Sequence, residues 1–176
     1  MKKSITLFFI YIIICFSSFA QESYQIFNSA GFKVKCNCTL KAHSSFIQKA
    51  KQQGVNNIFA AYYCAENEND FDIGVIIDII VYDQSVLFTN IQPSDYARIE
   101  KENLKQYEEN LSNSGYKYNY CNYKGSSAIE YSFDQLGLPT KAIVFFLNKR
   151  FYLLQVGTRT NLDYKYNGLK NNFIIL

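Results

Sequence analysis

Four strand-like segments follow one another closely in the second half of the chain, and they constrain the fold more than any other feature. They cover Tyr116 to Tyr123, Ser127 to Asp134, Lys141 to Leu147 and Phe151 to Thr158. Each is rich in aromatic or β-branched residues, which are typical of strands. The connections between them are short, which favours antiparallel hairpins over the helical crossovers that parallel strands need. The sequence therefore predicts an antiparallel sheet.

A long helix is predicted directly before this group of strands. Ser94 or Asp95 is a suitable N-cap after Pro93, and Gly115 is a suitable end. Between these positions, apolar residues recur at heptad-like spacing: Ala97, Leu104, Tyr107 and Leu111. The pattern predicts a helix of roughly 20 residues with one apolar stripe and a charged outer face.

The remaining elements lie on either side of this region. Alternation of apolar and polar residues from Phe32 to Lys41 predicts a ten-residue strand with one wet face. Ile58 to Ala65 and Phe71 to Tyr82 are β-prone, and a short helical turn is expected from Ser45 to Gln53. A last helix is expected from about Leu162 to Asn171, before an apolar terminus. The predicted fold class is α+β, an antiparallel β-sheet packed with one long central helix and a C-terminal helix.

Residues 1–20 resemble a secretory signal peptide. Two lysines precede an apolar run from Ile5 to Phe16, and Ser18-Phe19-Ala20 is a small-x-small cleavage site. The apolar run is shorter than the roughly 20 residues that span a bilayer. We therefore expect residues 21–176 to form one periplasmic or secreted domain, with no transmembrane anchor after cleavage.

Charge and composition exclude some classes of function. The formal net charge is +3, and without Lys2 and Lys3 there are 16 basic residues against 15 acidic ones. Such a balance does not suit a nucleic-acid binder, which carries a concentrated positive charge. With 48% hydrophobic residues the composition is that of an ordinary globular protein.

Four cysteines follow the predicted leader: Cys36, Cys38, Cys64 and Cys121. An even number in an oxidising compartment favours disulfides. Cys36 and Cys38 point the same way along a strand, so each is expected to reach another strand. We expect Cys36 to bond Cys64 and Cys38 to bond Cys121, although spacing leaves the other pairings open. The spacing does not match a zinc site, because neither Cys64 nor Cys121 has a near partner, and no metal or cofactor is expected.

Acidic residues provide the candidates for catalysis. Asp78 interrupts the apolar run Val75 to Val81, and a carboxylate buried there would have a raised pKa. Alternation along the strand favours a simpler interpretation, in which the side that carries Asp78 meets solvent or a helix edge. The acidic cluster Glu66 to Asp72 does not match a calcium loop and is expected to be a solvated loop. The single histidine, His43, stands in a polar stretch and is interpreted as a surface or capping residue.

Tyrosines provide the candidate binding surface. Tyr116, Tyr118 and Tyr120 alternate along one side of a predicted strand, and Tyr123 lies nearby. Stacked tyrosines can bind sugars, peptides or single-stranded nucleic acid. Tyrosine is also a common structural residue of strands, so packing is the alternative explanation.

The order of elements resembles a known family. A long helix ending in Gly115-Tyr116, a four-strand meander and a closing helix ending in Asn172-Phe173 are similar to the α/β/α sandwich shared by PsbP, the extrinsic photosystem protein, and a Ran-binding nuclear import factor. Segments Gly137 to Ala142 and Tyr152 to Gly157 also resemble small exported bacterial proteins of unknown function. The resemblance implies a fold and carries no catalytic signature. Neither photosystem binding nor Ran binding is implied, since no motif for them is present.

The sequence thus favours an exported, non-catalytic binding or accessory protein whose partner is an unidentified protein or small molecule. The alternative is a hydrolase of envelope or extracellular polymers that uses Asp78 or the cluster Glu66 to Asp72. The first predicts an aromatic-lined concavity. The second predicts two carboxylates converging in a cleft.

Overall fold

A computed structural model describes residues 23–67, 74–135 and 137–176. The predicted leader lies outside the described residues, as do positions 68–72 of the acidic cluster and the first residues of the strand expected from Phe71. Among the helices of the described segments, none is long and apolar enough to cross a membrane.

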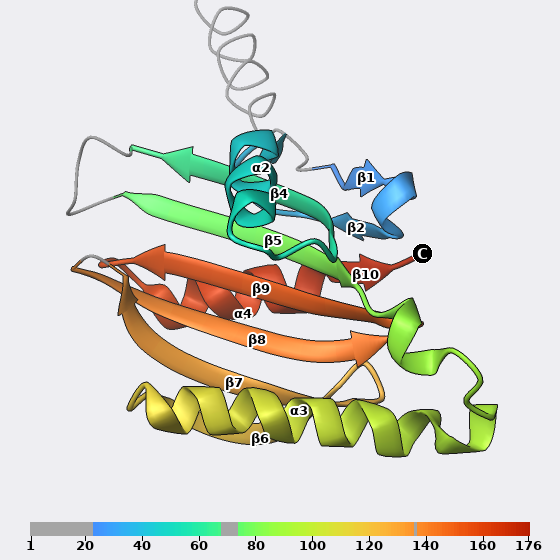
Figure 1. The fold of residues 1–176 in the computed structure, drawn as a ribbon. Coiled ribbons are helices and arrows are strands. Elements are labelled where there is room, and N and C mark those ends of the chain that lie inside the picture. The colour runs from blue at the N-terminus through green and yellow to red at the C-terminus, as the bar shows by residue number, and fades with distance from the viewer. Residues whose placement is uncertain (1–22, 68–73, 136) are drawn as a thin grey trace, which may run out of the picture.

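A seven-stranded antiparallel sheet forms the centre of the molecule (Figure 1). Its strand order is β3-β4-β5-β9-β8-β7-β6. The strands are β3 (Lys41–Ala42), β4 (Ile58–Glu66), β5 (Val75–Asp83), β6 (Lys117–Tyr123), β7 (Ser126–Gln135), β8 (Leu138–Leu147) and β9 (Arg150–Thr158). The four closely spaced segments form the predicted meander, and β9 continues the sheet by pairing with β5. The α+β class and the antiparallel sheet are confirmed.

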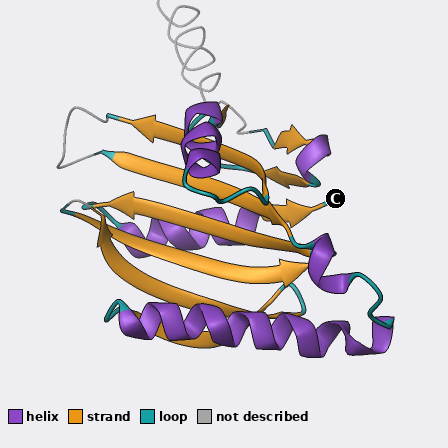
Figure 2. Ribbon diagram, viewed as in Figure 1, coloured by secondary structure: helices purple, strands orange, loops and turns teal. Residues whose placement is uncertain are grey.

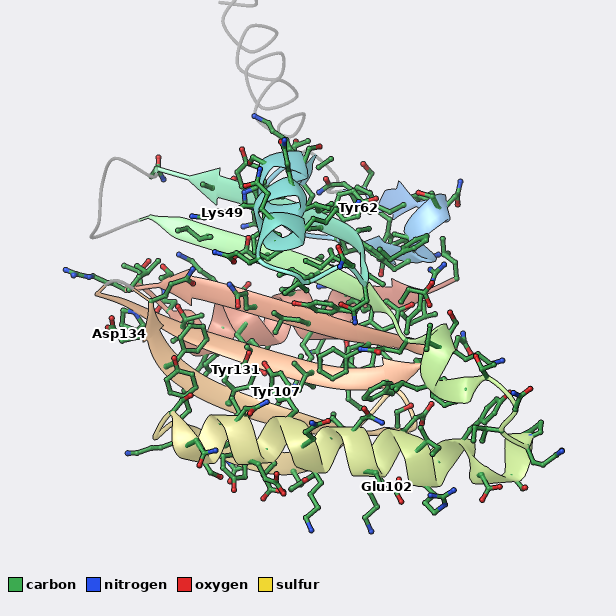
Figure 3. The ribbon with its side chains drawn as sticks, viewed as in Figure 1. Lys49, Tyr62, Glu102, Tyr107, Tyr131 and Asp134 are labelled. Carbon is green, nitrogen blue, oxygen red and sulfur yellow. A yellow bond between two sulfur atoms is a disulfide. The ribbon has the colours of Figure 1, made fainter. Side chains whose placement is uncertain are left out.

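Helices cover both faces of this sheet (Figure 2). Helix α3 (Tyr96–Asn113) follows two short 3-10 turns, η2 (Ser85–Phe88) and η3 (Pro93–Asp95). Its buried Leu104 and Leu111 pack on one face of the sheet, which we call the α3 face. Figure 3 shows Tyr107 of α3 close to Tyr131 of β7, and their hydroxyl oxygens are 2.9 Å apart.

Two further helices complete the layers. Helix α2 (Ser44–Gln52) packs its buried Ala50 with Ile80, which places α2 on the α3 face. Helix α4 (Leu162–Asn172) packs Tyr166 and Leu169 on the opposite face, which we call the α4 face. The sheet therefore lies between helices on either side.

A small second sheet extends the core on the α4 face. It consists of β1 (Gln25–Phe27), β2 (Phe32–Val34) and β10 (Phe173–Ile175), paired antiparallel in the order β1-β2-β10. The short 3-10 turn η1 (Asn28–Ala30) connects β1 to β2. The apolar C-terminus, which the sequence indicated without assigning a strand, thus pairs with β2 and fixes the end of α4.

The ten-residue strand predicted from Phe32 to Lys41 is wrong. The chain leaves β2 after Val34 and rejoins the large sheet only at β3. Between the two strands, the side chain of Gln25 binds backbone groups that a neighbouring strand would bind in a sheet. Its Nε2 donates to the carbonyl of Cys38 at 2.7 Å, and its Oε1 accepts from the amide of Leu40 at 2.8 Å. Apolar and polar residues do alternate in this segment, but its first residues belong to the small sheet and its last residue to the large one.

Candidate functional site

A cavity of about 340 Å³ lies between α4 and the irregular segment that follows β2. Helix α4 contributes Tyr164, Asn167, Gly168 and Asn171, and residues 35–38 form the opposite wall. Val75, Ile77 and Leu169 contribute apolar lining. We call this cavity the α4 pocket. Its volume is within the range of small-molecule sites.

The helical wall follows from the periodicity of α4. Tyr164, Asn167, Gly168 and Asn171 are spaced i, i+3, i+4 and i+7, so they share one stripe of the helix. Tyr164 is 81% exposed. A Cβ added at Gly168 would have no heavy atom within 4 Å outside its own helix and neighbours. The missing side chain at Gly168 therefore leaves the middle of this wall open.

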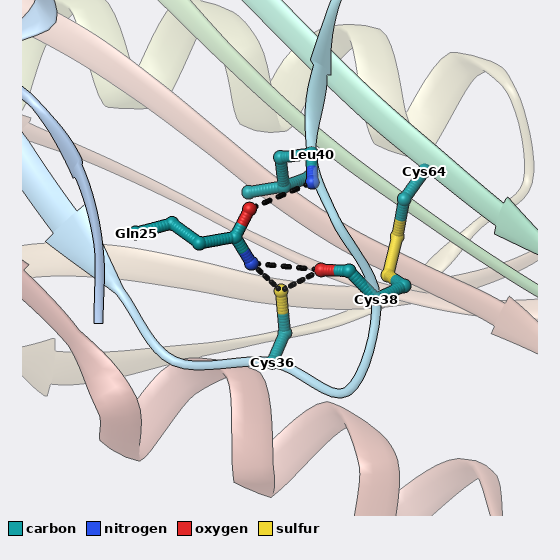
Figure 4. The surroundings of a disulfide bond; sticks show 5 residues. All are labelled: Gln25, Cys36, Cys38, Leu40 and Cys64. Atoms are coloured by element: carbon teal, nitrogen blue, oxygen red, sulfur yellow. Dashed lines mark hydrogen bonds between the residues drawn. A yellow bond between two sulfur atoms is a disulfide. The ribbon is translucent and has the colours of Figure 1, made fainter. Parts of the chain in front are cut away.

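A disulfide fixes the opposite wall (Figure 4). It joins Cys38 to Cys64 of β4, with a Cα–Cα distance of 6.1 Å. The Sγ of Cys36 donates to the carbonyl of Cys38 at 3.2 Å, and Gln25 binds the same carbonyl. The covalent bond and these hydrogen bonds hold the segment beside α4 although it belongs to no strand.

The predicted cysteine pairs, Cys36 with Cys64 and Cys38 with Cys121, are wrong. Cys38 and not Cys36 bonds Cys64, because the sulfur of Cys36 turns toward the carbonyl of Cys38. Cys121 lies on β6 at one edge of the sheet, with β7, β8, β9 and β5 between it and β4. This separation is too large for a bond between Cys121 and either cysteine of the Cys38–Cys64 disulfide.

The charged groups at the pocket sum to a net charge of +1. Lys35 and Lys165 line it together with Glu66. The Nζ of Lys165 donates to the hydroxyls of Thr158 at 3.4 Å and Thr160 at 2.9 Å. The ammonium of Lys165 is thus held by neutral partners.

Three of the four candidate tyrosines lie on β6, on both of its faces, and Tyr116 directly precedes the strand. The hydroxyls of Tyr118 and Tyr120 both donate to the carboxylate of Glu108 on α3, at 2.9 and 2.7 Å. Burial and the Glu108 carboxylate raise the pKa of Tyr120 to about 12. Tyr116 stacks on Phe133 with ring centroids 5.3 Å apart. These three side chains pack toward the α3 face.

Tyr123 lies on the α4 face. It is buried against Phe145, and its hydroxyl donates to the carbonyl of Lys170 on α4 at 2.6 Å. Of the four tyrosines, Tyr120 borders an open groove of about 500 Å³ along α3, where Arg98, Lys101 and Lys105 also lie. The structure therefore separates the four side chains, and the binding role of this set stays a prediction.

Asp78 lies on the α3 face of β5. The Nε2 of Gln155 donates to its Oδ2 at 2.7 Å. Burial raises the pKa of Asp78, and the hydrogen bond from Gln155 opposes the shift. Glu66 lies on the α4 face, because it shares the α4 pocket with Val75 and Ile77. These two carboxylates are therefore on opposite sides of the sheet and do not converge.

His43 stands at the start of α2. Its ring lies 4.4 Å from that of Tyr63 and 5.3 Å from that of Phe46. Within residues 23–67, 74–135 and 137–176, no three His, Cys, Asp or Glu side chains gather as a metal site would require.

Comparison with known proteins gives no family for the chain. No family model matches the sequence, and no curated protein matches it. A solved structure with partial similarity is that of PA94 from Pseudomonas aeruginosa, a protein of unknown function. It is 15% identical, with a TM-score of 0.36, and the match covers 57% of this chain and 69% of the other. A similarity this distant supports no argument about fold or function.

Sequence reasoning missed the α4 pocket, although one local signal was present. A glycine inside a predicted helix lowers its stability relative to alanine by roughly 1 kcal/mol. Gly168 is such a residue, and it is flanked at helical spacing by Tyr164 and Asn171. An internal glycine with exposed polar and aromatic neighbours on one helical stripe is therefore a sequence signal for a surface pocket.

Proposed function

We propose that this chain is an exported, non-catalytic binding protein that takes a small polar molecule in the α4 pocket. The observation that supports this is the pocket itself, whose lining combines the exposed Asn37, Asn167 and Asn171 with the apolar Val75, Ile77 and Leu169. In the described part of the chain, these three side chains make no hydrogen bond to other protein groups. A mostly apolar lining with a few polar groups is the usual composition of a ligand site.

Binding is favoured over hydrolysis by the positions of the acids. A glycosidase needs two carboxyl groups within about 10 Å of each other, flanking the scissile bond. Asp78 and Glu66 lie on opposite faces, and the partner of Asp78 is the amide of Gln155. The α4 pocket thus has groups that orient a ligand and lacks, among the described residues, a pair of acids to cleave it.

Export to the periplasm or the medium is part of the proposal. The Cys38–Cys64 disulfide supports it, since disulfides persist mainly in oxidising compartments. We also keep the PsbP-like sandwich as a proposal for the family. Helices on both faces of an antiparallel sheet are compatible with that architecture.

Solvent mapping by NMR tests the proposed site. The 15N-labelled full chain is titrated with acetamide, ethylene glycol and acetate as small polar probes. We expect the amide signals of Asn37, Gly168 and Asn171 to shift together. Gly168→Leu fills the open part of the pocket and is expected to abolish these shifts.

A matched variant controls for the added side chain. Glu109→Leu places the same leucine at an exposed position of α3, outside the pocket. It is expected to leave the probe shifts unchanged. Shifts that persist in Gly168→Leu, or that cluster elsewhere on the surface, would refute the proposal.

A further inference from the structure

We infer that the ligand of the α4 pocket is a neutral saccharide unit. This inference rests on the proposed function and names the chemical class that the site would take. It draws on the exposed side chain of Tyr164, the asparagines of the lining, the helix dipole of α4 and the pairing of β5 on both sides.

Tyr164 provides a stacking surface. It is 81% exposed, compared with 50% for Tyr120 and 39% for Tyr24. It lines the pocket one helical turn before Gly168, on the same stripe of α4. An aromatic face attracts the C–H face of a sugar ring through apolar contact, while the hydroxyl edge of the sugar stays available for hydrogen bonds.

The amides match the other side of such a ligand. Asn37 comes from one wall of the pocket, and Asn167 and Asn171 come from the other. An asparagine side chain offers two donors and an acceptor, and a sugar hydroxyl is likewise both donor and acceptor. Amides on two walls can therefore bind hydroxyls on two edges of one ring.

The helix dipole disfavours an anion at one end of the pocket. Lys35 and Lys165 with Glu66 give the lining a net charge of only +1. The pocket also extends along α4 as far as Asn171 and Asn172, at the C-terminal end of the helix. That end carries the negative pole of the helix dipole, which disfavours anions.

The strand pairing argues against an extended peptide added at β5. Peptides often bind by adding a strand to an open sheet edge. The strand that contributes Val75 and Ile77 is β5, which pairs with β4 on one side and β9 on the other. No unpaired edge of β5 therefore faces the pocket in its described wall.

A titration with three ligand classes tests the inference. The 15N-labelled full chain receives cellobiose, maltose and N,N′-diacetylchitobiose as saccharides, trialanine as a peptide and citrate as an anion. We expect at least one disaccharide to shift the amide signals of Asn37, Gly168 and Asn171, and trialanine and citrate to leave them in place. Tyr164→Ala is expected to weaken saccharide binding about tenfold, since it removes the stacking ring.

Two variants separate stacking from other effects of the mutation. Tyr164→Phe keeps the ring and is expected to bind within about twofold of the wild type, since stacking needs only the ring face. Tyr120→Ala removes a half-exposed tyrosine on the other side of the molecule and is expected to change nothing at the pocket.

The outcomes distinguish the two proposals. If trialanine or citrate shifts the pocket signals and no disaccharide does, the saccharide inference is wrong and the binding site stands. If Tyr164→Phe loses binding as fully as Tyr164→Ala, stacking is not the cause and the inference is also wrong. If no compound, including the small polar probes, shifts these signals, both proposals fail.

Discussion

The Nζ of Lys170 lies 2.6 Å from the Oε1 of Glu130 and joins α4 to β7. The hydroxyl of Tyr166 donates to the same carboxylate oxygen at 2.9 Å. The carbonyl of Lys170 accepts the hydroxyl of Tyr123. These bonds hold α4 on the sheet, so they position the helical wall of the α4 pocket.

Glu130→Gln is expected to lower the free energy of unfolding at neutral pH. It is also expected to make that free energy depend less on pH in the acidic range. Burial alone would raise the pKa of Glu130, but hydrogen bonds from Lys170 and Tyr166 outweigh it and hold the pKa below its ordinary value of 4.5. A depressed pKa contributes stability above the unfolded value and loses it as the pH falls through the folded value. Urea unfolding between pH 7 and pH 3 measures the effect.

The expected loss at neutral pH is about 1 kcal/mol, because both side chains of the pair are partly solvated. Glu102→Gln removes the exposed Arg98–Glu102 pair and serves as control. It is expected to change stability by less than about 0.5 kcal/mol. Equal losses of stability in the two variants would contradict the prediction that the ion pair of Glu130 contributes more than the exposed pair of Glu102.

Cys64→Ala is expected to destabilise the chain by about 2 to 4 kcal/mol, because it removes the disulfide to Cys38. Cys121→Ala changes a cysteine outside this bond and is expected to cost less. Chemical unfolding compares the two variants. Alkylation of the unfolded chain without reductant is expected to label Cys36 and Cys121, whereas Cys38 and Cys64 react only after reduction.

Asp78→Asn is expected to stabilise the chain by about 1 kcal/mol at pH 7, since it removes a partly buried charge and keeps a polar partner for Gln155. Burial raises the pKa of Asp78, so the folded state binds the proton more tightly. Stability therefore falls as the pH rises from the unfolded pKa of about 3.8 through the folded one. The gain should disappear in acid, where both states are protonated.

Asp83→Asn is the control for this prediction. Asp83 lies on the same strand and is exposed, and a hydrogen bond from the backbone of Ser85 lowers its pKa. Its replacement is expected to act in the opposite direction at pH 7. Thermal melts from pH 3 to pH 8 measure both variants, and a gain for Asp78→Asn that is independent of pH would exclude a buried charge as its cause.

Two glycines are expected to respond in opposite directions to alanine. A Cβ at Gly157 would lie 2.9 Å from the Cδ2 of Leu138 and 3.0 Å from the Oγ1 of Thr140, so Gly157→Ala should cost about 1 to 3 kcal/mol. Gly168→Ala meets open space and gains helix propensity, so it should stabilise by up to about 1 kcal/mol. Thermal melts measure both, and a loss at Gly168 would mean that its surroundings are closed.

The sequence by itself determined the elements whose cause is local. The meander from β6 to β9 was predictable because strand propensity and short connections act between neighbours in the chain. Helix α3 was predictable for the same reason, since its apolar stripe repeats with the helical period and Gly115 ends it. These features specify the α+β class without knowledge of distant contacts.

Tertiary structure alone decided the features that depend on residues far apart in sequence. Cys38 rather than Cys36 meets Cys64 because Gln25 reorganises the segment between β2 and β3, and no periodicity encodes that contact. The α4 pocket exists because this segment faces Gly168, about 130 residues later in the chain. Strand period and helix propensity describe neighbouring residues, whereas a cavity is defined by the packing of segments that meet only in the folded state.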